Sequence, residues 1–352
     1  MSSSTYTHKL NSAIVISSRI RLARNLVGRK FVASATEKQL LEVFEDCTNA
    51  ILKTKKMKSA TLYNMGEISD FDRAVLSEKR LISKELETCN NAKGAIISKD
   101  NKLSAFINEE DHIRIQAIDL GLSLSALYKT ANALDNEIEE HLEYAFSSDI
   151  GYITSCPTNM GTGMRASVMM HLPALSENYQ MEKIVRALNQ LGMVVRGANG
   201  EGSDSFNAYY QLSNQQTLGI SEEDIIKKIK TFCKKICQYE VNARYKIMED
   251  NPLLLVDKFL RARAILENCK LIDTEEALAN ISALRLAADM NLMGDGDSII
   301  KTLDDISLQI MPSHLQNHLD FFSSSSNKRD ALRAEFLNKK ISKLPNINIK
   351  KL

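Results

Sequence analysis

The sequence predicts a mixed α+β domain followed by an all-helical domain. Up to Asp250, short strand-like runs alternate with stretches of helical periodicity. From Asn251-Pro252 to the end, helical periodicity continues with almost no strand signal. A chain of 352 residues is also long enough to bury two hydrophobic cores. We therefore expect two domains, 1–250 and 251–352, that meet near Pro252.

Capping residues mark two helices of the first domain. Thr36 and Gln39 have the spacing of a capping box ahead of an amphipathic helix. Ser221 and Asp224 have the same relation to a long helix that continues to Asp250. The other elements expected in this domain are helices over 132–146 and 182–191 and strands over 94–97, 103–107, 151–155, 193–195 and 209–212.

Helical periodicity alone predicts the second domain. The expected helices are 253–266, 274–290, 298–308 and 328–339. The serines at 323–326 form a low-complexity patch and are expected to be a loop before the last helix.

Composition excludes several classes of protein. The hydrophobic fraction of 44% and charged fraction of 25% are ordinary for a globular chain, and the net charge of +1 points to neither nucleic acid nor an acidic membrane. The first nine residues lack the apolar core of a signal peptide, and no apolar run approaches the ~18 residues of a membrane span. Six scattered cysteines fit reduced thiols. We expect a cytoplasmic protein.

The first chemistry-bearing block is the run from Val15 to Asn25. Arg19 and Arg21 alternate with the apolar Ile20 and Leu22, so on a strand both guanidinium groups point to the same face. Two cations on one face are costly unless an anion lies between them, and a triphosphate suits the bidentate geometry of arginine. The alternative is a pair of surface arginines.

The second block is the run Asn108-Glu109-Glu110-Asp111-His112-Ile113-Arg114, at the end of a predicted strand. Three successive acids beside histidine and arginine are poor for strand stability, so a polar site is a reasonable interpretation. A solvated loop is the alternative.

The third block is a glycine-punctuated loop, Cys156-Pro-Thr-Asn-Met-Gly-Thr-Gly-Met-Arg-Ala-Ser167. It carries a cysteine at its start and Arg165 where a helix is expected to begin. The loop also satisfies G-x-G-x-x-[GA], a pattern of dinucleotide-binding folds. That alternative needs an acid closing a following strand, whereas Glu177 and Glu182 precede or enter a predicted helix.

The fourth block runs from Val195 to Gly202 and contains Arg196, Glu201 and three glycines in six residues. This spacing predicts a tight loop after a strand, with backbone amides free to face a ligand.

Together these blocks resemble the guanidino (phosphagen) kinases, which move the γ-phosphoryl group of ATP to a guanidinium nitrogen. The resemblance implies an antiparallel sheet flanked by helices, with ATP and Mg²⁺ as cofactors. It implies that Glu110 and Glu201 clamp the guanidinium and accept its proton, that Cys156 lies beside it, and that Glu109 serves Mg²⁺ through water. The implied nucleotide contacts are Ser17, Ser18, Arg19, Ile20, Arg21, Arg80, Arg114, Arg165, Ala166, Ser167, Val168, Met169, Arg196, Gly197, Ala198, Asn199 and Gly200.

The layout resembles the bacterial protein-arginine kinases within that family. The helical domain that precedes the arginine block in small-molecule guanidino kinases is missing, and a helical domain is expected at the other end. Arg329, Asp330 and Arg333 match the R-D-x-x-R-A motif that forms a phosphoarginine-binding pocket in this branch. On a helix the same spacing also describes ordinary surface pairing.

The resemblance implies an ATP-dependent kinase of arginine side chains in proteins. It further implies a homodimer, an activator protein, unfolded proteins and a stress-gene repressor as substrates, and delivery of marked proteins to a Clp unfoldase and protease. The alternatives are a free-arginine phosphagen kinase and a nucleotide-binding regulator without catalysis.

Overall fold

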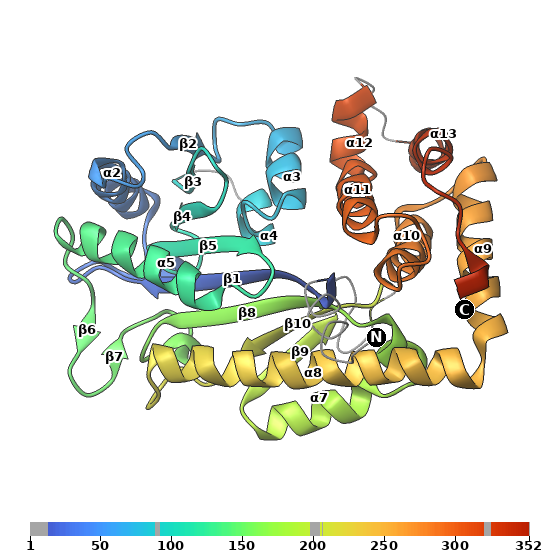
Figure 1. The fold of residues 1–352 in the computed structure, drawn as a ribbon. Helices are drawn as coiled ribbons and strands as arrows, with labels where there is room; N and C mark the ends of the chain where they lie inside the picture. The colour runs from blue at the N-terminus through green and yellow to red at the C-terminus, as the bar shows by residue number, and fades with distance from the viewer. Residues whose placement is uncertain (1–12, 89–91, 198–204, 206, 320–324, 352) are drawn as a thin grey trace.

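The computed structural model describes residues 13–88, 92–197, 205, 207–319 and 325–351. Its centre is an eight-stranded sheet in the order β2-β3-β4-β5-β1-β8-β10-β9, in which all neighbours are antiparallel (Figure 1). The strands are β1 Val15–Arg24, β2 Thr61–Asn64, β3 Gly94–Ile97, β4 Leu103–Ile107, β5 Ile113–Leu120, β8 Met164–His171, β9 Met193–Gly197 and β10 Tyr209–Asn214. A separate hairpin joins β6 (Phe146–Ser147) to β7 (Gly151–Tyr152).

Helices flank the sheet and then continue alone towards the C-terminus. Those within the first 250 residues are α2 Glu37–Lys53, α3 Asp70–Glu78, α4 Lys84–Glu87, α5 Leu124–Glu139, α6 Pro173–Glu177, α7 Met181–Gln190 and α8 Glu222–Asp250. Those that follow are α9 Pro252–Asn268, α10 Thr274–Asp289, α11 Gly296–Gln309, α12 Pro312–Leu319 and α13 Ser326–Ile341. The predicted fold class is confirmed.

One face of the sheet is apolar and carries the main core. Strand residues such as Ile20, Ile115 and Val168 are fully buried there, against α2, α5 and α8. The apolar residues of α5 recur at helical spacing from Leu124 to Ile138, which gives the helix one buried side. This layer fixes which strand residues face inwards, and it therefore fixes which residues face the other way.

The opposite face is covered only in part. Helices α3 and α4 pack a small second core, including Leu76 and Leu86, onto Ala95 and Phe106 of the β2–β4 end. Beyond that patch, strands β5, β1, β8 and β10 carry charged and polar side chains on this side. The candidate site lies there.

One long helix ends and another begins at Asn251. Helix α8 ends at Asp250, Asn251 takes an extended φ of −153°, and α9 begins with Pro252 at its first position. Proline suits that position because its missing N–H would have no partner there. The helices that follow pack mainly on one another, at the right of Figure 1.

A buried polar network joins the helical region to the sheet. Arg285 on α10 donates to the carbonyl of Ala13 (2.9 Å), to His171 Nδ1 (3.1 Å) and to Asp304 (2.9 Å). His171 Nε2 lies 2.7 Å from the hydroxyl of Ser282. Burial, followed by the charge of Arg285, holds the pKa of His171 well below its usual range. His171 is therefore a neutral imidazole whose Nδ1 accepts and whose Nε2 donates.

Several predicted elements are correct and others are wrong. The capping box at Thr36 is present, because its hydroxyl accepts from Gln39 N while Gln39 Oε1 accepts from Thr36 N. The helix expected over 132–146 instead spans Leu124–Glu139, because its apolar stripe begins upstream. The strand expected over 151–155 is reduced to two residues.

The largest error concerns the segment after the glycine loop. A helix was expected near Arg165, but Met164–His171 is the strand β8, paired with β1 on one side and β10 on the other. Its alternating burial arises from long-range pairing, which outweighs local propensity. Strand β5 and helix α12 were not predicted.

Candidate active site

Five arginines from four strands share one face of the sheet. Arg21 on β1 pairs with Arg165 on β8, and Arg114 on β5 lies opposite Ala23 of β1. Arg196 on β9 pairs with Gln211 of β10, which continues the same side. Because directly opposed residues of antiparallel strands point the same way, these side chains gather on one surface. We call Arg19, Arg21, Arg114, Arg165 and Arg196 the arginine face.

The arginine face is electrostatically strained. Burial, followed by the charges of Arg80, Arg165 and Arg114, lowers the pKa of Arg19 to about 10. Burial and then the charge of Arg19 lower the pKa of Arg21 well below its usual range. The Nε atoms of Arg21 and Arg165 are buried without a hydrogen-bond partner in the described structure. Such a set of cations is suited to a polyanion that supplies the missing acceptors.

Two polar residues of β10 hold these guanidinium groups. Arg19 Nη2 donates to Gln211 Oε1 at 3.0 Å, and Arg165 Nη2 donates to Ser213 Oγ at 3.3 Å. Neither residue was among the nucleotide contacts expected from the sequence. The alternation of polar Gln211 and Ser213 with apolar Tyr210 and Leu212 is the signal that could have found them.

Two acids pair with Arg114 at the edge of the arginine face. Its Nη1 forms an ion pair with Glu109 and its Nη2 with Glu110. Glu109 is buried, and burial raises its pKa despite the opposing charge of Arg114. The side chain of Glu110 is 42% exposed and can therefore meet a substrate from solution.

The neighbouring Asp111 and His112 have a structural role. Asp111 Oδ1 accepts from Asn25 Nδ2 (2.7 Å) and from the backbone N–H of Ser155 (2.6 Å). His112 Nδ1 accepts from the N–H of Leu26 at 3.0 Å. Both side chains are buried. They fasten the end of β1 to the start of the loop between β7 and β8, which carries Cys156 and is called the cysteine loop below.

The cysteine loop is held by hydrogen bonds from Thr217. Cys156 is half-buried, and its Sγ lies 3.0 Å from Thr158 Oγ1. Thr217 Oγ1 donates to the carbonyls of Thr158 (2.9 Å) and Met160 (2.7 Å). Burial, followed by the charges of Arg196 and Arg114, lowers the pKa of Arg165, which follows this loop at the start of β8.

Two glycines allow the loop to pack this closely. Gly161 has a φ of +101°, and a Cβ there would lie 2.4 Å from the carbonyl oxygen of Thr217. Gly163 has a φ of +62°, and a Cβ there would lie 2.5 Å from Arg24 Nη1. Arg24 is buried, bonds Asp135 at 2.6 Å, and takes no part in the arginine face. It is a structural anchor for the loop.

Not every predicted contact lies on this face. The side chains that lie on the same face of the sheet as Arg19 and Arg21 are those of Ser17, Ser167 and Met169. The side chains that lie on the helix-covered face instead are Ser18, Ile20, Ala166 and Val168, all buried. A strand places successive side chains on opposite faces, so a continuous run cannot line one site. Gly197 ends β9, whereas Ala198, Asn199, Gly200 and Glu201 lie outside the described residues.

The residues present are compatible with magnesium. Among the described residues, no cluster of three His, Cys, Asp or Glu side chains forms a metal cage. Mg²⁺ commonly keeps several waters and binds through one or two carboxylates together with substrate phosphates. Glu109, a buried carboxylate beside the arginine face, fits that role.

Arg333 is placed differently from the prediction. It is 1% exposed, and its Nε and Nη1 donate to the carbonyls of Ile310 (3.0 Å) and Ile272 (2.9 Å). Nη1 also contacts Asp330 Oδ1 at 2.5 Å. The guanidinium therefore holds the end of α11 and orients Asp330, and these bonds leave Nε and Nη1 unable to reach a phosphoryl group.

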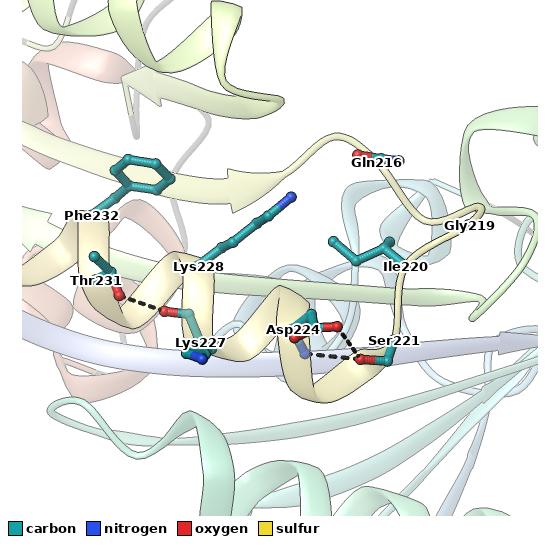
Figure 2. A pocket seen from close by; sticks show the side chains of 9 residues that line it. All are labelled: Gln216, Gly219, Ile220, Ser221, Asp224, Lys227, Lys228, Thr231 and Phe232. Carbon is teal, nitrogen blue, oxygen red and sulfur yellow. Dashed lines mark hydrogen bonds between the residues drawn. The ribbon is translucent and has the colours of Figure 1, made fainter.

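An open cleft also lies at the start of α8 (Figure 2). Lys228 and Phe232 extend from the helix towards the same side, where Gln216 and Ile220 form the other wall. None of the residues that line it was predicted to bind nucleotide or guanidinium. The chemistry is gathered on the arginine face and not in this cleft.

The chain is similar to known proteins along most of its length. A family model described as ATP:guanido phosphotransferase, C-terminal catalytic domain, matches residues 42–243. A second, described as protein-arginine kinase McsB C-terminal domain, matches residues 252–352. The chain is 41% identical to a protein-arginine kinase of Clostridium tetani, over 94% of this chain and 96% of that protein. It is 42% identical to one from Geobacillus stearothermophilus, over 88% and 85%.

Two solved structures of kinases have a similar fold. A lombricine kinase matches with a TM-score of 0.59 and 26% identity, over 67% of this chain and 68% of that one. A duplicated taurocyamine kinase from Schistosoma mansoni also has a TM-score of 0.59, with 28% identity over 66% of this chain and 34% of that one. Within the described residues, none of the helices is both long and apolar enough to cross a bilayer.

Proposed function

Because the chain belongs to the protein-arginine kinase branch of the ATP:guanido phosphotransferase family, we propose that it transfers the γ-phosphoryl group of MgATP to arginine residues in proteins. The observation that carries the proposal is the gathering of five arginines on one face of the sheet, with Glu109 and Glu110 paired to Arg114 at its edge.

In this proposal the arginine face binds the triphosphate. Phosphoryl transfer passes through a transition state whose charge is spread over the phosphoryl oxygens. Donors that are fixed before the reaction lower that barrier without reorganisation. Gln211 and Ser213 already orient Arg19 and Arg165. The repulsion between the arginines is relieved when the anion binds.

Glu110 would act on the acceptor. A guanidinium is a poor nucleophile because its lone pairs are delocalised and it carries an extra proton. Glu110, with Glu201, would fix the plane of the guanidinium and accept the proton that leaves as the N–P bond forms. The bond from phosphorus to the β–γ bridging oxygen breaks, and ADP departs. Binding of the acceptor would compete with Arg114 for Glu110, which leaves Arg114 to the phosphates.

Glu109 and Cys156 would assist. Mg²⁺ bound through water to Glu109 would neutralise charge on the phosphates. Cys156 would lie against the guanidinium without forming a covalent intermediate, because direct in-line transfer needs none. Thr217 bonds to the carbonyls of Thr158 and Met160 in its loop, and this contact would hold the thiol close to the acceptor.

The C-terminal helices would carry a second site. We place a phosphoarginine site at Arg329 and Asp330, with Arg333 holding Asp330 in position and not contacting the ligand. The 251–352 region would also form a homodimer, and an activator protein, a stress-gene repressor and a Clp unfoldase would be partners. Arg329→Ala with Asp330→Ala should abolish phosphoarginine binding in calorimetry, and equal binding by wild type and variant would remove this site from the proposal.

The main test is incubation with γ-labelled ATP and either an unfolded protein or free arginine. We expect acid-labile, base-stable label on the protein. Label on free arginine alone would identify a phosphagen kinase, and ATP binding without transfer to either acceptor would identify a regulator. Arg114→Lys and Arg165→Lys should impair transfer, because lysine keeps the charge but loses the bidentate geometry.

A further inference from the structure

Arg80 occupies a strained turn at the end of α3. The helix ends at Glu78, and Arg80 has a φ of +60°. The N–H of Arg80 bonds Ser77 O at 2.8 Å, and the N–H of Leu81 bonds Leu76 O at 3.0 Å. This pattern is a Schellman-type ending, in which the left-handed position usually belongs to glycine. An arginine there costs about 1 kcal/mol of backbone strain that glycine would avoid.

The strained turn lies against the arginine face. The charge of Arg80 is, after burial, the largest influence lowering the pKa of Arg19. The carbonyl of Arg80 accepts from Gln116 Nε2 at 3.1 Å, and Gln116 on β5 lies opposite Arg21. The backbone of the turn is therefore held against β5 at the rim of the arginine face, close enough for the charge of Arg80 to act on Arg19. A strained backbone conformation such as that of Arg80 persists only if contacts from the surrounding structure stabilise it.

The holding contact comes from the far end of the chain. The carboxylate of Glu78 accepts from the backbone N–H groups of Ser313 (2.8 Å) and His314 (2.9 Å), and from His314 Nδ1 (2.6 Å). The side chains of Glu78 and His314 are 9% and 11% exposed. The last residue of α3 is thus bound to the first turn of α12 by three hydrogen bonds.

The same contact is continuous with the R-D-x-x-R segment. Helix α12 begins at Pro312, two residues after Ile310, whose carbonyl accepts from Arg333 Nε. Arg333 in turn contacts Asp330. A continuous series of contacts and short backbone segments therefore runs from α13 through α12 and α3 to the turn that carries Arg80.

We propose that Glu78 is a positioning residue for nucleotide binding: by clamping the first turn of α12 to the end of α3, it fixes Arg80 on the arginine face. The helical C-terminal region thereby sets the affinity for ATP. This inference rests on the proposed function, since it takes the arginine face as the ATP site.

The test is a double-mutant cycle between Glu78 and Arg80 in the full-length protein, with the Kd for MgATP measured by calorimetry. Glu78→Ala should weaken ATP binding by about three- to tenfold, the cost of leaving one long side chain free to move. Arg80→Gly removes the side chain but suits the backbone. In that background Glu78→Ala should change the Kd by less than about twofold, because no side chain remains to be positioned.

Glu182→Ala is the matched control, because Glu182 pairs with Arg186 on the exposed surface of α7. It should leave the Kd unchanged. If Glu78→Ala does not fold, Glu78→Gln and His314→Ala replace it, since each removes part of the clamp.

The experiment distinguishes a failure of this inference from a failure of the proposed function. An unchanged Kd in Glu78→Ala with only a lower Tm, or the same fold-loss in both backgrounds, would mean that the contact merely stabilises the junction, and the inference would be wrong. If the wild type binds MgATP and transfers phosphoryl, the proposed function stands whatever the cycle gives. If the wild type binds no ATP, both the proposed function and the inference about Glu78 are wrong.

Discussion

The close approach of like charges on the arginine face predicts that removing one of them stabilises the unliganded protein. Burial and three neighbouring arginines lower the pKa of Arg19 to about 10, against about 12.5 for an unperturbed arginine. At about 1.4 kcal/mol per pKa unit, the charged form is disfavoured in the folded protein by roughly 3 kcal/mol. Partial exposure to solvent reduces this to about 2 kcal/mol.

The sign follows from the direction of the pKa. Because the pKa of Arg19 is lower in the folded than in the unfolded protein, the cost is present at every pH below about 10 and is relieved only above it. At neutral pH the substitution Arg19→Met should therefore stabilise the unliganded protein. The variant loses the hydrogen bond to Gln211, worth about 1 kcal/mol, which leaves a net gain of about 1 kcal/mol.

The assay is thermal unfolding with and without MgATP. For a chain of 352 residues, 1 kcal/mol corresponds to a rise in Tm of about 1–2 °C. MgATP at 100 times its Kd should stabilise the wild type by about 2.7 kcal/mol and the variant by much less. Arg29→Met is the control, because Arg29 already has the partners Glu42 and Asp46 on the surface and its loss should not stabilise.

A lower Tm for Arg19→Met would refute the reasoning, because it would mean that the arginines of this face are not in conflict. Equal stabilisation of variant and wild type by MgATP would refute the assignment of Arg19 to the phosphates.

Three further predictions concern single residues. Glu110→Gln keeps the shape but removes the charge, so turnover with an unfolded protein should fall on the order of 10²–10³; a rate near that of the wild type would exclude Glu110 as proton acceptor. Alkylation of the half-buried Cys156, followed by mass spectrometry, should slow when ATP and an arginine substrate are both present, and an isolable phosphocysteine would contradict its assisting role. Because the pKa of His171 is lower in the folded than in the unfolded protein, the unfolded protein binds the extra proton first. The free energy of unfolding should therefore decline as pH falls below about 6.5, by at most ~1.4 kcal/mol per pH unit. His171→Gln should remove that part of the pH dependence in denaturant unfolding, and an unchanged pH dependence would show that His171 does not titrate this way.

Features that depend on a few neighbouring residues could be predicted without the structure. Arg19 and Arg21 alternate with apolar residues, and that spacing alone put both on one side of a strand. The cap at Thr36 and the break at Pro252 were also readable, because each depends on a few neighbouring residues.

Which residues come together in space could be known only from the folded chain. Successive side chains of β8 point to opposite faces, so Ala166 and Val168 lie away from the arginine face although they alternate with Arg165 and Ser167 in sequence. Arg333, which local spacing offered to a ligand, is buried among backbone carbonyls. Glu78 meets α12 across more than 230 residues. Strand register, burial and such distant contacts are set by the packing of the whole chain, and local propensity has no information about them.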